Sequence, residues 1–216
     1  LLLDAKQIPV GMKMYPGNES EKPVLRKTIQ DLKKQNNIDG RTIQIADKGL
    51  NCARNILEAI DHCDGYIFSK SVKQLSETER TWVLLENDYT PVYDGSGEIH
   101  YSYKSCVEEF EYSYTDDSGK KVKRKVKEKR VVTFNPKLQK KQVREISKLV
   151  EKARKCRAAQ AKREEYGDSA KYIEFKSADG KKAITSLNEK AIQKDMESAG
   201  YNLLVTSEIK MDDQEI

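Results

Sequence analysis

The amino-acid sequence predicts a mixed fold of the α/β (α+β) class. Three observations lead to this prediction. Apolar runs of strand length alternate with amphipathic stretches over the first 70 residues. Segments with period-two alternation and turn residues between them follow in the middle of the chain. One long stretch with a helical apolar stripe, residues 137–163, lies among those segments.

The chain opens with a predicted hairpin. Its strands are Leu1–Leu3 and Ile8–Tyr15, and the turn Asp4–Gln7 joins them. Aspartate is favoured in such a turn because its side chain accepts hydrogen bonds from the nearby backbone, so Asp4 is interpreted as a turn residue. An amphipathic helix is predicted from about 21 to 36, with its apolar face formed by Val24, Leu25, Ile29 and Leu32.

A βαβ crossover is predicted next. The alternation of Ile43 and Ile45 indicates a buried strand that Gly49 ends; a helix near 51–63 and a strand at 65–69 follow. Asp47 stands at the carboxyl end of the first strand, where α/β sheets place ligands and metals. It has no evident structural role, since Asn51 is the better cap for the next helix. Asp47 is therefore a candidate metal ligand, although many strand-ending aspartates bind no metal.

Residues 71–210 are predicted to be rich in strands. The expected strands lie around Thr81–Leu85, Ile99–Tyr103, Val107–Tyr114, Lys121–Phe134, Tyr172–Phe175 and Tyr201–Ser207. The turn Asp116–Gly119 joins two of them into a hairpin. The long helix is expected to bury one apolar stripe, made of Val143, Ile146, Leu149, Val150 and Ala153.

Positive charge is concentrated in two places, and the formal net charge is +5. Eight of the eleven residues Lys120–Arg130 are basic, and the long helix carries many more. The candidate DNA-contacting residues are Lys123, Arg124, Lys125, Lys141, Arg144 and Lys148. Pairing of the hairpin lysines with Glu108, Glu109 and Glu111 is an equally supported interpretation, and solvated helix faces also look like this. The surplus nevertheless favours a polyanion partner.

Several classes of protein are disfavoured. The four cysteines are scattered without a paired C-x-x-C motif, and there are two histidines, so a zinc site is not expected and the thiols are expected to be reduced. No apolar run approaches the roughly 18 residues of a membrane span. With no secretory signal either, we expect a cytoplasmic protein. Because the sequence begins without Met inside an apolar strand, we expect it to be a segment of a longer chain.

The predicted order β-β-α-β-α-β, together with particular residues, resembles the catalytic core of bacterial insertion-sequence transposases of the D-D-E type, which have an RNase H-like fold. The resemblance is carried by Leu1–Asp4, by Ile8–Gly11 through Tyr15–Asn18 with Ser20–Glu21, and by Ile45–Leu50. It covers about residues 1–70 well. Beyond them Arg130–Phe134, the basic helix and Tyr201–Ser207 are similar in character and order.

The resemblance implies a partial RNase H-like core at 1–70, a β-rich insertion with a long basic helix at 71–210, and at 211–216 the lead-in to a glutamate-bearing helix. It implies a transposase that cleaves and joins DNA with Mg²⁺ or Mn²⁺ held by two aspartates and a glutamate. Asp47 corresponds to the second aspartate; the other two carboxylates are expected outside this sequence, so the segment alone is expected to be inactive.

The partners that the resemblance implies are the element ends, the target DNA and a second transposase copy in a synaptic dimer. Two alternatives remain open. One is a DNA-binding or oligomerisation module that keeps the fold without the chemistry. The other is a metal-dependent nuclease of the RNase H type.

Overall fold

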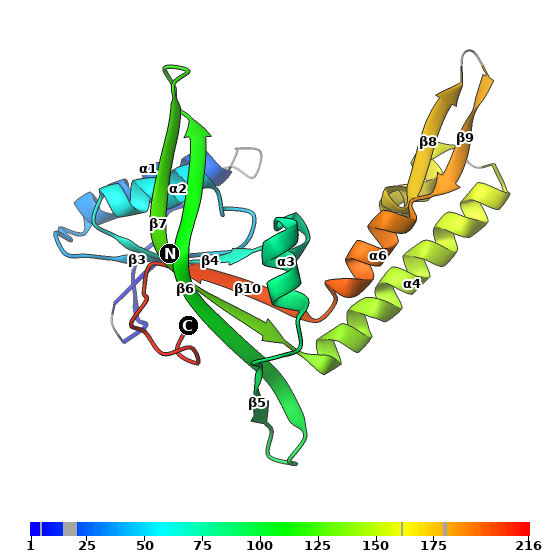
Figure 1. Ribbon diagram of the computed structural model, residues 1–216. Coiled ribbons are helices and arrows are strands. Elements are labelled where there is room, and N and C mark those ends of the chain that lie inside the picture. The colour runs from blue at the N-terminus through cyan, green and yellow to red at the C-terminus, as the bar shows by residue number, and fades with distance from the viewer. Residues whose placement is uncertain (5, 15–20, 161, 179–180) are drawn as a thin grey trace. The chain divides into compact units, whose positions relative to one another are not determined.

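The computed structural model describes residues 1–4, 6–14, 21–160, 162–178 and 181–216 (Figure 1). The predicted Pro16–Asn18 corner and Ser20 lie outside these ranges. The chain divides into two compact units, and each is assembled from separate stretches of sequence. Unit 1 comprises residues 1–71, 105–131 and 203–216, and unit 2 comprises residues 72–104 and 132–202. Both contain helices and strands, which confirms the mixed α/β class.

The largest sheet has six strands in the order β3-β4-β10-β7-β6-β5. β3 (Ile43–Ala46) and β4 (Gly65–Lys70) are parallel and are connected by α2 (Ala53–Asp61), so the predicted βαβ crossover is present. β10 (Tyr201–Thr206) runs antiparallel to β4, with Val205 opposite Phe68. β3 is an edge strand of this sheet.

The predicted N-terminal hairpin is present but short. β1 (Leu2–Leu3) pairs with β2 (Pro9–Gly11) in an antiparallel sheet of their own. Asp4 is the turn residue that the sequence predicts, because its Oδ1 accepts hydrogen bonds from the backbone N–H groups of Lys6 and Ile8 at 2.8 and 2.9 Å. The large apolar side chains of this hairpin are mostly exposed, from 45% for Leu3 and Val10 to 71% for Leu1.

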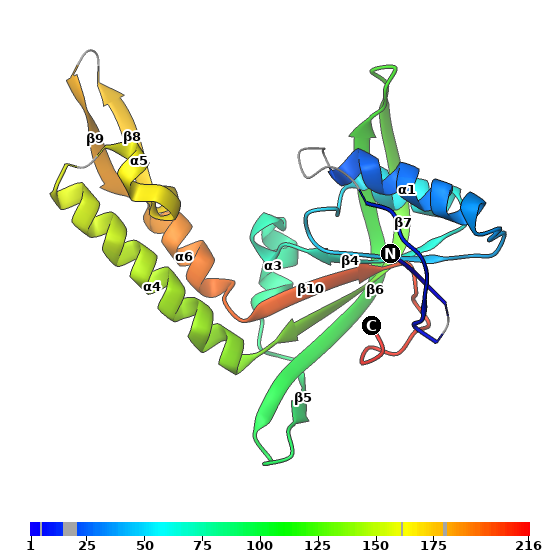
Figure 2. The same cartoon turned by 180° about the vertical axis from the view of Figure 1, so that it is seen from behind.

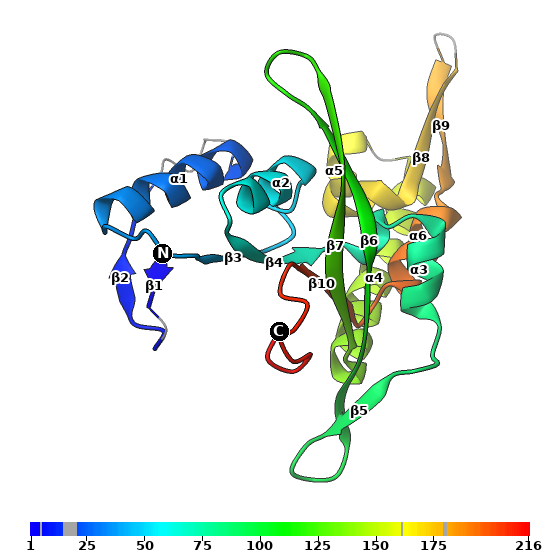
Figure 3. The ribbon, with the colours of Figure 1, turned by 60° about the vertical axis from the view of Figure 1, so that its left-hand side comes forward.

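Helices cover one face of the sheet in unit 1. α1 (Glu21–Gln35) and α2 lie on the same side of β3 and β4 (Figure 3). Because successive residues of a strand point to opposite faces, Tyr66 and Phe68 share one face, where both are fully buried with Ile56 and Leu57 of α2. Leu203 and Val205 of β10 are also fully buried. The opposite face carries Ile43 and Ile45, which are 39% and 76% exposed, so the strand is present but the prediction that these two side chains are buried is wrong.

A long hairpin follows the predicted turn. β6 (Ile99–Thr115) is a single strand where the sequence analysis expected two, and β7 (Lys121–Phe134) has the predicted bounds. The turn between them is closed by hydrogen bonds from Asp116 N–H to the Lys120 carbonyl and from Gly119 N–H to the Asp116 carbonyl. Gly119 has φ +83°, a left-handed conformation that glycine adopts without steric cost.

Unit 2 is built around α4 (Pro136–Ala158), the predicted long helix. α4 and α6 (Glu189–Glu197) lie side by side (Figure 2). Ile146, Val150 and Ala153 of the predicted stripe are buried against Tyr166 and Tyr172, while Val143 and Leu149 pack around them. Near them lie α5 (Arg163–Tyr166), the 3-10 helix Gly167–Tyr172, and the antiparallel pair β8 (Ile173–Ala178) and β9 (Lys181–Leu187).

The predicted strand at Thr81–Leu85 is wrong. These residues belong mainly to α3 (Glu77–Leu84), which follows the short 3-10 helix Val72–Gln74. A capping box starts α3: Ser76 Oγ accepts from Glu79 N–H, and the Glu79 carboxylate accepts from Ser76 N–H at 2.9 Å. Two orphan backbone donors are satisfied in this way, which outweighs the β-propensity of Thr81-Trp82-Val83.

β5 (Thr90–Tyr93), which pairs with β6 in unit 2, was not predicted, and neither were β9, α5, α6 and the two 3-10 helices. In the part of the chain that the structure describes, no helix is both long and apolar enough to cross a bilayer. All four cysteines carry free thiols.

Candidate functional site

Asp47 follows β3 directly, as predicted, and its side chain is exposed. The prediction that it has no structural role is wrong. Asp47 Oδ1 accepts a hydrogen bond from Gly49 N–H at 2.9 Å, and its carbonyl accepts from Leu50 N–H at 3.2 Å. The side chain therefore closes the turn that ends the strand.

Asn51 does not cap α2 either. The N-cap is Cys52, which makes no side-chain capping hydrogen bond. The Asn51 side-chain amide instead donates to the Ser69 carbonyl at 3.0 Å and ties the loop after Asp47 to the end of β4. Hydrogen bonds thus hold Asp47 and this loop in place at the carboxyl ends of the two parallel strands.

A divalent metal ion needs more ligand atoms than the Asp47 carboxylate supplies. Mg²⁺ takes six oxygen ligands in near-octahedral geometry and gives up its water reluctantly, so a lone carboxylate holds it weakly. Among the described residues, no group of three or more His, Cys, Asp or Glu side chains is placed to hold a metal ion. Asp47 fits the role of one metal ligand, and the described residues do not complete a site around it.

A long run of exposed positive charge lies on α4 in unit 2. Nine residues of this helix are Lys or Arg and two are Glu. The predicted residues Lys141, Arg144 and Lys148 are all exposed and line one shallow hollow of about 360 Å³ together with Lys137, Lys140 and Glu145. The structure therefore brings the three predicted helix residues together.

These side chains belong to a longer line, which we call the α4 ridge. It consists of six exposed residues: Lys137, Lys141, Arg144, Lys148, Lys152 and Lys155. Their spacings of three and four residues place them on one side of the helix. At 1.5 Å rise per residue the ridge is about 27 Å long. Within the described ranges, Lys141, Arg144, Lys148 and Lys152 have no ion pair, whereas Lys137 lies 3.3 Å from Asp94 and Lys155 lies 3.6 Å from Glu151.

Local chemistry explains why this helix forms and presents the ridge outward. Asn135 Oδ1 caps its start by accepting from Leu138 N–H at 2.9 Å, and Pro136 occupies the first turn, where no intrahelical donor is needed. Lys155 and Arg157 in the last turn favour the negative end of the helix dipole. Burial of Ile146, Val150 and Ala153 on the opposite side fixes the rotation of the helix.

The three predicted hairpin residues do not share one face of β7. Lys123 and Lys125 point to one side and Arg124 to the other, because side chains alternate along a strand. Lys123 pairs with Glu111 at 2.7 Å, as the charge-balanced interpretation expected for this glutamate. Arg124 instead pairs with Asp61 of α2 at 2.6 Å, a partner that was not predicted.

One exposed line of charge on β7 was predicted only in part, through Lys123 and Lys125. The odd-numbered residues Lys121, Lys123, Lys125 and Lys127 are all exposed; we call them the lysine row. The even-numbered residues Arg124 and Glu128 face the helices, where Glu128 is fully buried. The period-two alternation around Val122 and Val126 was the available signal.

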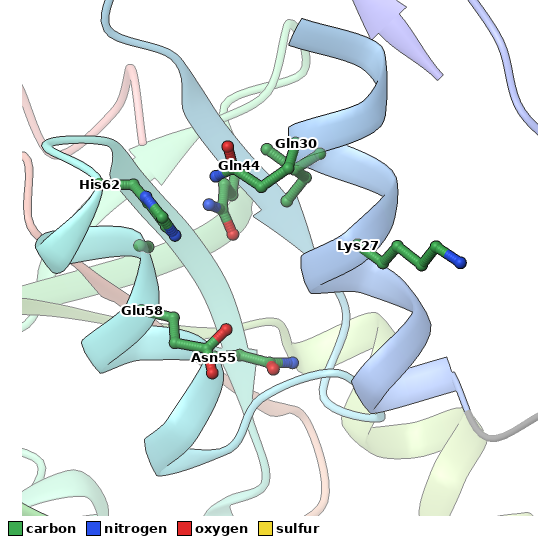
Figure 4. A pocket seen from close by; sticks show the side chains of 8 residues that line it. Lys27, Gln30, Gln44, Asn55, Glu58 and His62 are labelled. Atoms are coloured by element: carbon green, nitrogen blue, oxygen red, sulfur yellow. The ribbon is translucent and has the colours of Figure 1, made fainter. Parts of the chain in front are cut away.

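A groove of about 220 Å³ lies between α1 and α2 in unit 1 (Figure 4). Gln44 of β3 forms part of its wall, and the other lining residues are Lys27, Ile29, Gln30, Asn55, Glu58, Ala59 and His62. Asn55 is 1% exposed and donates to the Leu50 carbonyl at 2.8 Å. None of the predicted site residues lines this groove.

Comparisons of the chain with models of protein families, with curated proteins and with solved structures give no match.

Proposed function

We propose that this chain binds DNA through the phosphate backbone, as part of a transposase of the D-D-E type. The observation that supports DNA binding best is the α4 ridge. Six basic side chains lie in one exposed line about 27 Å long, and four of them have no ion pair among the described residues.

The physical basis is counterion release. Duplex DNA carries one negative charge per about 1.7 Å of axis and a condensed cation atmosphere, and a lysine or arginine that meets a phosphate releases part of it. The α4 ridge is suited to this because its charges are spread along a helix whose opposite side is fixed in the core of unit 2. Such contacts read no bases, so we propose binding without sequence preference.

The transposase assignment rests on the resemblance described above, and the element order supports it. The order β1-β2-α1-β3-α2-β4 is the one on which the resemblance was stated. β3 is an edge strand of the six-stranded sheet, and this position suits pairing with one more strand, which in the proposed transposase carries the first aspartate. Asp47 then supplies one of the three carboxylates that hold Mg²⁺ or Mn²⁺.

Duplex binding measured over a range of salt concentrations tests the proposal. Replacing Lys141, Arg144 and Lys148 by Gln should lower the slope of log affinity against log salt by up to about 2.7, at about 0.9 per lost phosphate contact. A matched variant carries Gln at the exposed Lys6, Lys34 and Lys190 and changes the net charge equally. Equal slopes for the two variants would show that α4 does not contact DNA.

A further inference from the structure

The lysine row on β7 continues into a fifth lysine that is covered. Lys129 has the same parity as Lys121 to Lys127 and thus lies on the same face of the strand, but it is only 7% exposed. The segment Glu208–Ile216 lies on this face, opposite α1 and α2 (Figures 1 and 3). All of these residues belong to unit 1.

The cover is acidic and makes anion-type contacts. Lys129 Nζ donates to the Met211 carbonyl and pairs with the Asp213 carboxylate, both at 2.5 Å. Ser105 Oγ of β6 donates to the other carboxylate oxygen of Asp213 at 2.6 Å. An ammonium group and a hydroxyl thus converge on one anion, an arrangement that would also hold a phosphate oxygen.

The rest of the segment has the same character. Asp212 and Glu215 flank Asp213, and the residues after Thr206 form turns and bends without a helix or strand. Burial alone would raise the pKa of Asp213, but the hydrogen bonds from Lys129 and Ser105 outweigh it and hold this pKa below its ordinary value of 3.8. The carboxylate is therefore ionised at neutral pH.

We propose that Lys129 and Ser105 form a phosphate subsite at the end of the lysine row, which the Asp213 carboxylate occupies until a polyanion displaces it. This inference rests on the proposed DNA binding. The lysine row supplies the approach because its four ammonium groups recur at every second residue of one strand and lead to the covered site. Segment Glu208–Ile216 thereby competes with the phosphate backbone and weakens binding.

The salt dependence of duplex binding tests the subsite. In the wild type, Lys129 exchanges one anion for another, so this position releases few ions. In Asp213→Asn, Lys129 keeps its hydrogen bond to the Met211 carbonyl but has lost the Asp213 carboxylate before binding, and the slope of log affinity against log salt should steepen by about 0.9. In a Lys129→Gln background, Asp213→Asn should have no such effect. Asp39→Asn, an exposed change of equal charge elsewhere in unit 1, is the control.

Equal effects of Asp213→Asn with and without Lys129, or of Asp213→Asn and Asp39→Asn, would overturn the subsite. Hydrogen exchange of the wild type gives a second readout that needs no variant. Amides of 207–216 should exchange faster when duplex is bound, and unchanged or slower exchange would contradict displacement. If the α4 substitutions flatten the slope while these tests fail, only the subsite is refuted. If the wild type does not bind duplex, the proposed function and the subsite both fail.

Discussion

Glu128 should be the most sensitive polar residue of unit 1, and Glu128→Gln tests why. Its side chain is fully buried in the middle of β7. Oε2 accepts hydrogen bonds from the hydroxyls of Tyr66 and Tyr112 at 2.7 and 2.6 Å, and Oε1 accepts from Arg130 Nε at 2.8 Å. Glutamine keeps the shape of the side chain but replaces one acceptor oxygen by an NH₂ group, which is a donor and would face another donor. The substitution also removes the negative charge beside the guanidinium of Arg130, whose side chain is 3% exposed.

The expected loss follows from these contacts. Removing one partner of a buried ion pair typically costs about 3–5 kcal/mol, because the other charge stays buried without it. Tyr112→Phe should cost less, about 1.5–3 kcal/mol, since it removes one hydrogen bond to a charged group and leaves the pair intact. Glu109→Gln, on the exposed side of β6, should change the unfolding free energy by no more than about 0.5 kcal/mol.

Urea unfolding followed by circular dichroism measures all three variants. The reasoning about the buried network would be refuted by a Glu128→Gln protein within about 1 kcal/mol of the wild type, a difference too small for the loss of a buried ion-pair partner. Alkaline titration of the wild type gives an independent readout. Burial, followed by the charge of Glu128, raises the pKa of both Tyr66 and Tyr112, so these two should ionise after the exposed tyrosines.

Two further predictions concern single aspartates. Burial opposes ionisation of Asp195 in unit 2, but hydrogen bonds from Lys73, Tyr172 and Lys171 outweigh it and lower its pKa below 3.8. The stability that the ionised Asp195 contributes is thus present above pH 3.8 and is lost as pH falls through the folded-state pKa. Asp195→Asn should remove this part of the acid sensitivity of the unfolding free energy. An unchanged pH profile of the unfolding free energy would contradict this prediction. For Asp47, Asn retains the oxygen that accepts from Gly49 N–H, so Asp47→Asn should keep wild-type stability while Asp47→Ala loses about 0.5–1.5 kcal/mol. Under the proposed transposase function, both should abolish strand transfer by the complete protein, and a fully active Asp47→Asn would remove this residue from the proposed metal site.

Periodicity made most of the fold predictable where one face of an element is buried. The stripe of α4 is the clearest case, since Ile146, Val150 and Ala153 could be assigned to the core from their spacing. The error at Thr81–Leu85 came from residues with high β-propensity, while the deciding signal, Ser76 followed three positions later by Glu79, was present and overlooked. β5 and β9 were not predicted because they become strands by pairing with β6 and β8.

The candidate site was less predictable, because it depends on contacts between distant parts of the chain. Arg124 could be recognised as basic, but its pairing with Asp61 depends on where α2 lies beside β7. Asp47 could be placed at a strand end, but its hydrogen bond to Gly49 depends on the conformation of the turn. Of the six predicted DNA-contacting residues, the three on α4 do lie together. Their common side of the helix was predictable because it follows from their spacing in the sequence alone.

The faces of the two basic elements decide which is the stronger DNA candidate. Eight basic residues lie between Lys120 and Arg130, a denser run than any on α4. On β7, however, Arg124, Lys129 and Arg130 already have acidic partners within unit 1, and so does the exposed Lys123. A cation that must leave a carboxylate before meeting a phosphate adds little counterion release. The α4 ridge has fewer such partners, and we therefore expect most of the salt dependence of DNA binding to come from unit 2.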